Sequence, residues 1–227
     1  MDGLRGCVPI LGVLTSLLLG AGGSIHDERA AISFSEEPDP PGALPTTQWS
    51  TAFEQVNATT LEKGKLLAMI PALGREWRVS LEVSLDKLNR RGPESARRAS
   101  VLHMTEETGT KFGKYTPAIW IHRGRILVST TLGAKLIFNK MFPSNASTLG
   151  NWTQIVVSQS LKGKDYIYAI KIGGKEVLSM TNTRPRLFYD VKVFAGSPLF
   201  NPLEGSIRRL KIELGEEVSS FVNEGIE

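Results

Sequence analysis

The sequence predicts an all-β fold, an antiparallel sandwich of two sheets, and three observations lead to this prediction. Apolar side chains alternate strictly with polar ones from Trp77 to Leu85, which is the period of a strand with one buried face. About a dozen short segments of this kind follow one another, separated by clusters of Gly, Pro and Asn. The sequence also lacks an amphipathic helical pattern of normal length. Strands spaced in this way are typical of two packed antiparallel sheets.

The individual strands are expected where alternating or apolar runs lie between turn residues. They fall at residues 52–56, 65–70, 76–85, 100–105, 118–122, 125–130, 136–139, 153–159, 166–172, 176–180, 189–195 and 206–214. Gly173-Gly174 predicts a two-residue hairpin turn, because both positions of such a turn adopt a positive φ, which glycine does without strain. Arg123-Gly124 predicts a second hairpin of the same kind.

The chain of 227 residues has room for one domain, expected at residues 51–214. Residues 1–23 combine Arg5, an apolar run and small residues, which is the layout of a secretory signal peptide. The apolar run is short for a transmembrane span of about 20 residues, and an uncleaved anchor is the alternative. Residues 24–50 are expected to form a disordered Pro-rich, acidic linker, and 215–227 a flexible tail. A secreted, extracellular protein without a transmembrane anchor is therefore predicted.

Charge and cysteine content exclude several classes of function. Lys and Arg exceed Asp and Glu by 27 − 23 = 4, and the pI is about 9.2, so the chain is only mildly basic. Nucleic acid is not expected as a partner, because basic residues do not interleave with stacking aromatic ones. The single cysteine, Cys7, lies in the predicted signal peptide. Thiol catalysis, a cysteine zinc site and disulfides are therefore not expected in the mature chain.

No pattern in the sequence predicts a catalytic site, so no catalytic residue is assigned and the protein is not expected to be an enzyme. Sandwich glycosidases use a pattern close to E-x-D-x-x-E, which is absent, and Glu106-Glu107 would point to opposite faces of a strand. His103 and His122 are expected to be packed strand residues, since no nucleophile motif accompanies them. They would form a metal site only if their strands paired in register.

No metal or other cofactor is assigned from the sequence. The acidic residues are scattered singly, and none forms the D-x-[DN]-x-[DN]-G loop that binds calcium. A calcium site at the rim of the sandwich stays open, with its ligands unknown.

Three glycosylation sequons are the strongest local motifs. Asn57, Asn145 and Asn151 each begin an Asn-x-Ser/Thr triplet without proline at x. Behind a signal peptide these asparagines are expected to carry N-linked glycans. Asn57 and Asn145 are favoured because they lie in turn-like contexts, whereas the bulky Trp152 directly follows Asn151.

The densest positive cluster consists of Arg90, Arg91, Arg97 and Arg98, in a loop predicted at residues 86–98. We treat the four arginines as a candidate polyanion-binding site, because such a loop can bind sulfated glycans or acidic matrix polymers through charge-assisted hydrogen bonds. The alternatives are protease-processing points and a solvated loop that prevents edge-to-edge pairing of sheets.

The tryptophans are expected to divide between core and surface. Trp77, Trp120 and Trp152 belong to alternating strands and are expected in the core, whereas Trp49 is expected to be exposed.

Several strand sequences resemble those of laminin-G-like domains, which are jelly-roll sandwiches of the concanavalin A-like group. They include W-R-V-S-L-E-V, T-P-A-I-W-I-H, L-G-N-W-T-Q-I-V-V-S-Q and Y-I-Y-A-I-K-I-G-G, and the resemblance covers approximately residues 65–214. The closest similarity is to secreted cnidarian proteins of the extracellular, skeletal organic matrix.

The resemblance implies a secreted, non-enzymatic binding or structural protein of the extracellular matrix, with a mineralised skeletal matrix as the specific expectation. Its partners would be matrix components or anionic glycans, bound through surface loops. A carbohydrate-binding, lectin-like module is the alternative, because one sandwich fold hosts several functions. The loop at 197–202 lacks the Asp and aromatic residues that relatives often carry there, which weakens a calcium or sugar site at that rim.

Overall fold

The computed structural model describes residues 48–86, 98–106, 115–132, 135–142 and 151–215. The predicted signal peptide, residues 24–47 of the predicted linker and residues 216–227 of the predicted tail lie outside this part of the chain. So do Asn145, Arg90, Arg91 and Arg97. No helix within the described residues has the length and apolar character needed to cross a membrane.

The described residues form thirteen β-strands. Their bounds are β1 (Trp49–Gln55), β2 (Thr59–Thr60), β3 (Lys65–Leu73), β4 (Trp77–Leu85), β5 (Arg98–Thr105), β6 (Tyr115–His122), β7 (Arg125–Leu132), β8 (Lys135–Phe142), β9 (Thr153–Lys162), β10 (Asp165–Ile172), β11 (Lys175–Asn182), β12 (Phe188–Ala195) and β13 (Gly205–Gly215).

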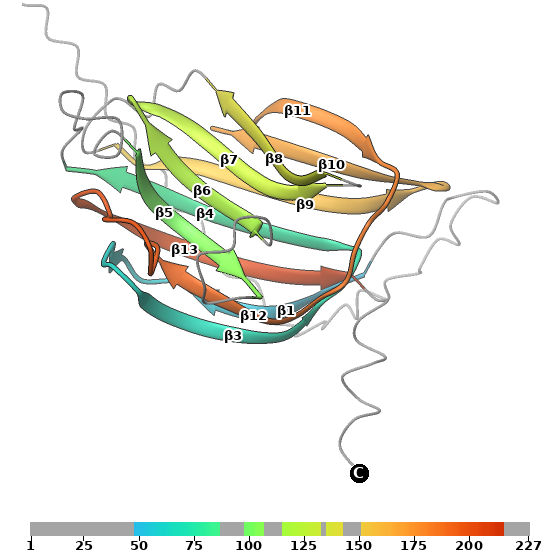
Figure 1. The fold of residues 1–227 in the computed structure, drawn as a ribbon, viewed down its shortest axis with the longest axis horizontal. Helices are drawn as coiled ribbons and strands as arrows, with labels where there is room; N and C mark the ends of the chain where they lie inside the picture. Colours follow the sequence, from blue (N-terminus) through green and yellow to red (C-terminus); the bar gives the residue numbers. More distant parts are fainter. Residues whose placement is uncertain (1–47, 87–97, 107–114, 133–134, 143–150, 216–227) are drawn as a thin grey trace, which may run out of the picture. The chain divides into compact units, whose positions relative to one another are not determined.

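The strands build two antiparallel sheets, which Figure 1 shows as two layers. Sheet A has the strand order β1-β13-β4-β9-β10-β11, and β2 pairs with the start of β13. Sheet B has the order β3-β12-β5-β6-β7-β8. Neighbouring strands are often distant in sequence, and Trp49 of β1, for example, lies opposite Gly215 of β13. The all-β, two-sheet antiparallel sandwich predicted from the sequence is confirmed.

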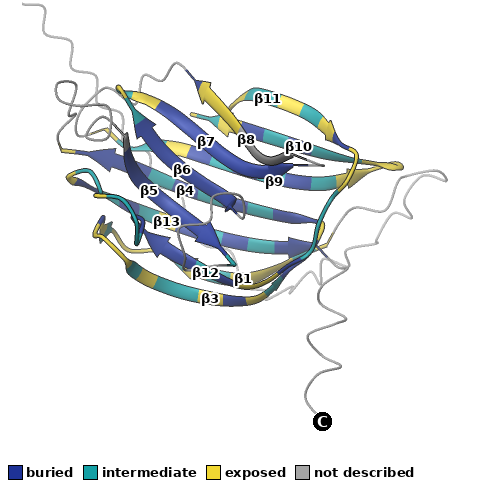
Figure 2. Ribbon diagram, in the orientation of Figure 1, coloured by how far each residue is buried: buried dark blue, intermediate teal, exposed yellow. Residues whose placement is uncertain are grey.

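The main core lies between the two sheets and consists of the side chains that face the opposite sheet. Along β4, Trp77, Val79 and Leu81 are at most 2% exposed, as the alternating pattern predicts. Sheet B contributes Ile119 and Val193 to the same cluster, each fully buried. Burying one such side chain stabilises the fold by roughly 1.5–3 kcal/mol. Figure 2 shows these buried positions continuing along the central strands of both sheets.

Every predicted strand segment is a strand in the structure, and most strands are longer than predicted. The two-residue β2 was not predicted, because so short a strand shows no period. The predicted hairpin turns are confirmed, with φ of 58° and 77° at Gly173 and Gly174 and of 52° and 75° at Arg123 and Gly124. β1 begins at Trp49, inside the segment expected as linker.

A second, smaller apolar cluster lies on the side of sheet B that faces away from sheet A. Tyr115 and Trp120 are at most 6% exposed in this cluster, and the ring of Phe200 lies 5.2 Å from that of Trp120. Their neighbours Ile119 and Ile121 belong to the main core, so β6 is buried on both faces. Trp120 is therefore buried as predicted, but in the second cluster and not between the sheets.

Candidate ligand-binding groove on sheet A

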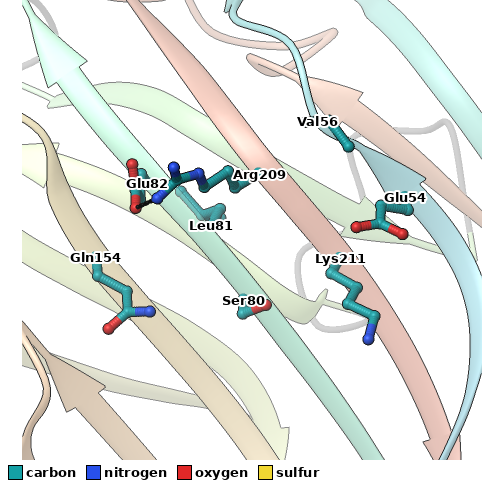
Figure 3. A pocket seen from close by; sticks show the side chains of 8 residues that line it. All are labelled: Glu54, Val56, Ser80, Leu81, Glu82, Gln154, Arg209 and Lys211. Carbon is teal, nitrogen blue, oxygen red and sulfur yellow. Dashed lines mark hydrogen bonds and ion pairs between the residues drawn. The ribbon is translucent and has the colours of Figure 1, made fainter. Parts of the chain in front are cut away.

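An open groove of about 330 Å³ lies on the outer face of sheet A, which is the face turned away from sheet B (Figure 3). Its lining comes from β1 with the residue after it, and from β4, β9 and β13. The lining residues are Glu54, Val56, Ser80, Leu81, Glu82, Gln154, Arg209 and Lys211. Most of them are polar or charged, so the groove offers both donors and acceptors of hydrogen bonds.

Strand pairing brings the groove residues together although they are far apart in sequence. Glu82 on β4 lies opposite Arg208 on β13 and opposite Gln154 on β9. Directly paired residues of neighbouring strands have their side chains on the same face, with Cβ atoms about 4.5–5.5 Å apart. The register therefore places the Glu82 carboxylate between a guanidinium group and a side-chain amide.

A β-bulge in β13 places two consecutive arginines beside Glu82. The register with β4 shifts between Arg208 and Lys211, and Arg209 has a φ of 49°, in the left-handed region that few non-glycine residues occupy. Arg208 Nε donates to Glu82 Oε2 at 2.6 Å, and Arg209 Nη1 donates to Oε1 at 2.9 Å. Each carboxylate oxygen thus has its own arginine, and Figure 3 shows Arg209 reaching Glu82.

The two guanidinium groups keep Glu82 ionised. The hydrogen bond from Arg208 is the largest influence and lowers the pKa of Glu82 below its ordinary value, and Arg209 lowers it further, while desolvation acts in the opposite direction. A carboxyl group with a lowered pKa holds no proton at neutral pH, so Glu82 does not serve as a general acid. Glycoside hydrolysis needs a protonated carboxyl group at the leaving oxygen, and Glu82 is not suited to that role.

A second ionic cluster continues the charged face along β4 and β13. Glu213 accepts a hydrogen bond from Lys211 at 2.8 Å and pairs with Arg78 at 3.5 Å. The hydrogen bond with Glu213 is the main cause that raises the pKa of Lys211. The Glu82 cluster and the Glu213 cluster together contain four cations and two carboxylates, so their net charge is 4 − 2 = +2, or +1 once Glu54 is included. The cations are Arg78, Arg208, Arg209 and Lys211. The face around the groove is therefore positive on balance, whereas the four charged residues that line the groove itself, Arg209 and Lys211 against Glu54 and Glu82, cancel.

Two tryptophans flank this face, each in contact with an arginine. The guanidinium carbon of Arg208 lies 4.1 Å from the ring centroid of Trp152, and that of Arg78 lies 4.4 Å from the ring centroid of Trp49. Such cation–π contacts contribute about 0.5–1 kcal/mol at exposed sites. Both tryptophans are half-buried. The predictions that Trp152 lies in the core and that Trp49 is exposed were therefore wrong.

The predicted glycosylation sites within the described residues lie at the surface. Asn57 is exposed between β1 and β2, and Asn151 is exposed just before β9. Exposure is the condition that a sequon needs for modification.

Arg98, predicted in a basic loop, is instead the first residue of β5 and lies opposite His122.

His103 lies in the ring cluster on the outer side of sheet B. Its ring centroid is 5.0 Å from that of Tyr115, 5.7 Å from that of Trp120 and 6.3 Å from that of Phe194. The side chain is 2% exposed, and desolvation lowers its pKa to about 4. The prediction that His103 is a packed strand residue is therefore confirmed.

The two strand histidines do not form a metal site. β5 and β6 pair, but His103 lies opposite Ala118 whereas His122 lies opposite Arg98, so the two imidazoles do not face each other. Among the residues that the structure describes, no three His, Cys, Asp or Glu side chains are grouped so as to hold a metal ion.

The sequence did not identify Glu82, Arg208 or Arg209 as site residues. The adjacent pair Arg208-Arg209 inside an otherwise alternating strand was the available signal, because two consecutive polar residues break the period of two and indicate a bulge. Its partner Glu82 could not be assigned without the register.

The sandwich and its exposed groove define the structural class, a two-sheet antiparallel fold like that of concanavalin A-like lectin domains. The botulinum neurotoxin serotype D binding domain matches with a TM-score of 0.50 and 14% identity, over 79% of this chain and 46% of that one. The same toxin's ligand-binding domain in complex with N-acetylneuraminic acid matches with a TM-score of 0.49 and 17% identity, over 79% and 46%. The Ruminococcus gnavus IT-sialidase CBM40 bound to α2,3-sialyllactose matches with a TM-score of 0.49 and 12% identity, over 72% and 92%.

These likenesses, all at low identity, show the fold alone. The chain spans about half the length of the toxin domains that it matches. No protein-family model and no curated protein sequence matches the chain. The concanavalin A-like jelly-roll fold implied by the strand sequences is confirmed. The closer resemblance to laminin-G-like cnidarian matrix proteins finds no link in these comparisons and stays a prediction.

Proposed function

We propose that the protein is a non-enzymatic carbohydrate-binding module that takes an anionic glycan into the groove on sheet A. The observation that carries the proposal is the Arg209 side chain, which lines the open groove with 65% of its surface exposed, on a face of sheet A whose paired charges are positive on balance. An acidic sugar carries a carboxylate or sulfate group, and a guanidinium group binds such anions through two parallel hydrogen bonds.

The remaining groove residues fit the neutral part of a sugar. Gln154 and Ser80 both donate and accept hydrogen bonds, and Glu54 accepts them, which suits the hydroxyl groups of a pyranose. Val56 offers an apolar side chain at the edge of the groove. In this arrangement Arg209 and Lys211 bind the acidic group, and Glu82 fixes the Arg209 guanidinium in position.

The fold supports a binding role by analogy. The toxin structure that matches with a TM-score of 0.50 is itself a binding domain, although one fold can host several functions. The predicted signal peptide and the exposed sequons fit an exported protein, which would meet acidic glycans outside the cell. We therefore favour the lectin-like module over the structural role in a mineralised matrix that the sequence resemblance implies.

The test compares acidic and neutral ligands of the same core, 3′-sialyllactose and lactose, together with a sulfated oligosaccharide, by calorimetric titration of the full chain. We expect the acidic ligands to bind, lactose to bind more weakly, and the affinity for acidic ligands to fall as salt is added. Arg209→Gln is expected to weaken acidic binding by about tenfold or more, the equivalent of at least 1.4 kcal/mol.

Arg125→Gln is the matched control, because Arg125 is an exposed arginine on sheet B and its replacement changes the net charge equally. It should leave affinity unchanged. Equal binding of lactose and sialyllactose, or wild-type affinity in Arg209→Gln, would overturn the proposal.

A further inference from the structure

The exposed sequon at Asn57 lies directly beside the groove. Asn57 follows Val56, which is 61% exposed and lines the groove. Consecutive Cα atoms are about 3.8 Å apart, so the attachment point of a glycan on Asn57 lies within one residue of the groove wall. Gln154 of β9 forms the opposite side of the groove. The second described sequon, Asn151, lies just before β9.

The backbone around Asn57 is held to sheet A on both sides. The Arg209 backbone N–H donates to the Val56 carbonyl oxygen at 3.2 Å. Beyond Asn57, Thr59 of β2 pairs with Ile207 of β13. Because these contacts join the segment to the strand that carries Arg209, a glycan on Asn57 starts from a fixed point beside that strand, at the β1 side of the groove.

We propose that an N-linked glycan on Asn57 covers the groove and thereby controls access of the acidic ligand, an inference that rests on the proposed function. Glycosylation adds a bulky hydrophilic group at the surface, and here that group occupies space at the edge of an open groove. The exposed Val56 side chain, an apolar group at this edge, is covered at the same time.

The modification is a transfer of an oligosaccharide from a lipid diphosphate donor of the secretory pathway. A bond forms between the Asn57 Nδ2 atom and C1 of the first sugar, and the C1–oxygen bond to the diphosphate breaks. The amide gives up one proton, and the lipid diphosphate leaves. No oxidant or reductant is needed.

The experiment compares two preparations of the full chain, one from a host that does not glycosylate and one from a host that does. Intact-mass and peptide measurements establish the occupancy of Asn57. Binding of 3′-sialyllactose is then titrated for both. We expect the glycosylated protein to bind about tenfold more weakly, or not measurably, a difference of 1.4 kcal/mol or more.

Two variants remove the sequon in different ways, Asn57→Gln and Thr59→Ala, and both should restore the affinity of the unglycosylated protein in the glycosylating host. Asn151→Gln is the control that removes the other described sequon, and it should leave the affinity low. In the host without glycosylation, Asn57→Gln should bind as the wild type does, which separates the glycan from the asparagine side chain.

The outcomes distinguish the two proposals. If the unglycosylated wild type fails to bind any acidic ligand, the proposed function itself fails. If it binds, but the form glycosylated at Asn57 binds equally well, the inference about Asn57 is overturned and the proposed function stands. An Asn57 that carries no glycan in a secreting host, or an Asn151→Gln variant that alone restores binding, also overturns the inference.

Discussion

Replacing His103 by phenylalanine should remove much of the acid sensitivity of the fold. The imidazole is 2% exposed among aromatic rings, and its Nδ1 has no hydrogen-bond partner among the described residues. Phenylalanine keeps a ring in this cluster and removes both ring nitrogens, including the buried Nδ1. The substitution therefore isolates the cost of protonating a buried imidazole.

The size of the effect follows from the two pKa values. Burial lowers the pKa of His103 from 6.5 to about 4, so the unfolded chain binds a proton more readily than the folded one. A group with a depressed basic pKa destabilises the fold as the pH falls below 6.5, and the loss levels off below about pH 4. Between about pH 7.5 and about pH 5, linkage predicts a loss of roughly 2 kcal/mol from this residue alone.

The assay is denaturant unfolding of the wild type and of His103→Phe at both pH values. Carboxylates titrate equally in both proteins. The loss in free energy of unfolding between the two pH values, compared between wild type and variant, therefore reports His103 alone. We expect the wild type to lose roughly 2 kcal/mol more than the variant on acidification. Equal losses in both proteins, or an imidazole pKa near 6.5 in an NMR titration, would refute the reasoning.

Two further predictions concern sheet A and the connection after β12. Gly196→Ala should destabilise the fold by roughly 1–3 kcal/mol in thermal unfolding, because φ is 99° and the added Cβ would meet the Glu62 carbonyl oxygen. Gly163→Ala is the control. It should cost less, because Gly163 also has a positive φ, of 64°, but an added Cβ there would meet open space. Glu82→Gln should cost about 0.5–1 kcal/mol at neutral pH, since its arginine partners are partly exposed. That cost should vanish as acid titrates the wild-type carboxyl through its lowered pKa, and a pH-independent cost would contradict this account.

The alternating pattern was sufficient to predict most of sheet A. Trp77 to Leu85 shows one buried and one polar face, which is the signature of a strand with solvent on one side. The strands at the centre of sheet B are less easily read, because β6 is apolar on both faces and the pattern does not show which side meets the core. This is why Trp120 was predicted in the main core.

Trp152 shows how parity decides the face of a residue. Ile155 and Val157 are fully buried, so residues an odd number of positions away, such as Gln154, lie on the outer face. Trp152 has the parity of Gln154, and the apolar character of tryptophan was given more weight than its position. The Arg208 guanidinium covers the ring instead.

The candidate site could not be assembled from the sequence. Glu82 and Arg209 are 127 positions apart in the chain, and they meet only because β4 and β13 are neighbours with a bulge between Arg208 and Lys211. Local patterns report the face of each strand but not its partner or register. The sequons at Asn57 and Asn151, which were read locally, mark exposed positions without showing what they adjoin.

The position of β13 has a consequence for biosynthesis. This strand is inserted between β1 and β4, which are made much earlier on the ribosome. Until β13 emerges, both earlier strands have backbone groups without their final partner, and such edges invite aggregation. Sheet A therefore closes only after residues 205–215 have been made, and a premature stop codon before Gly205 would leave a product without β13 and without the groove residues Arg209 and Lys211.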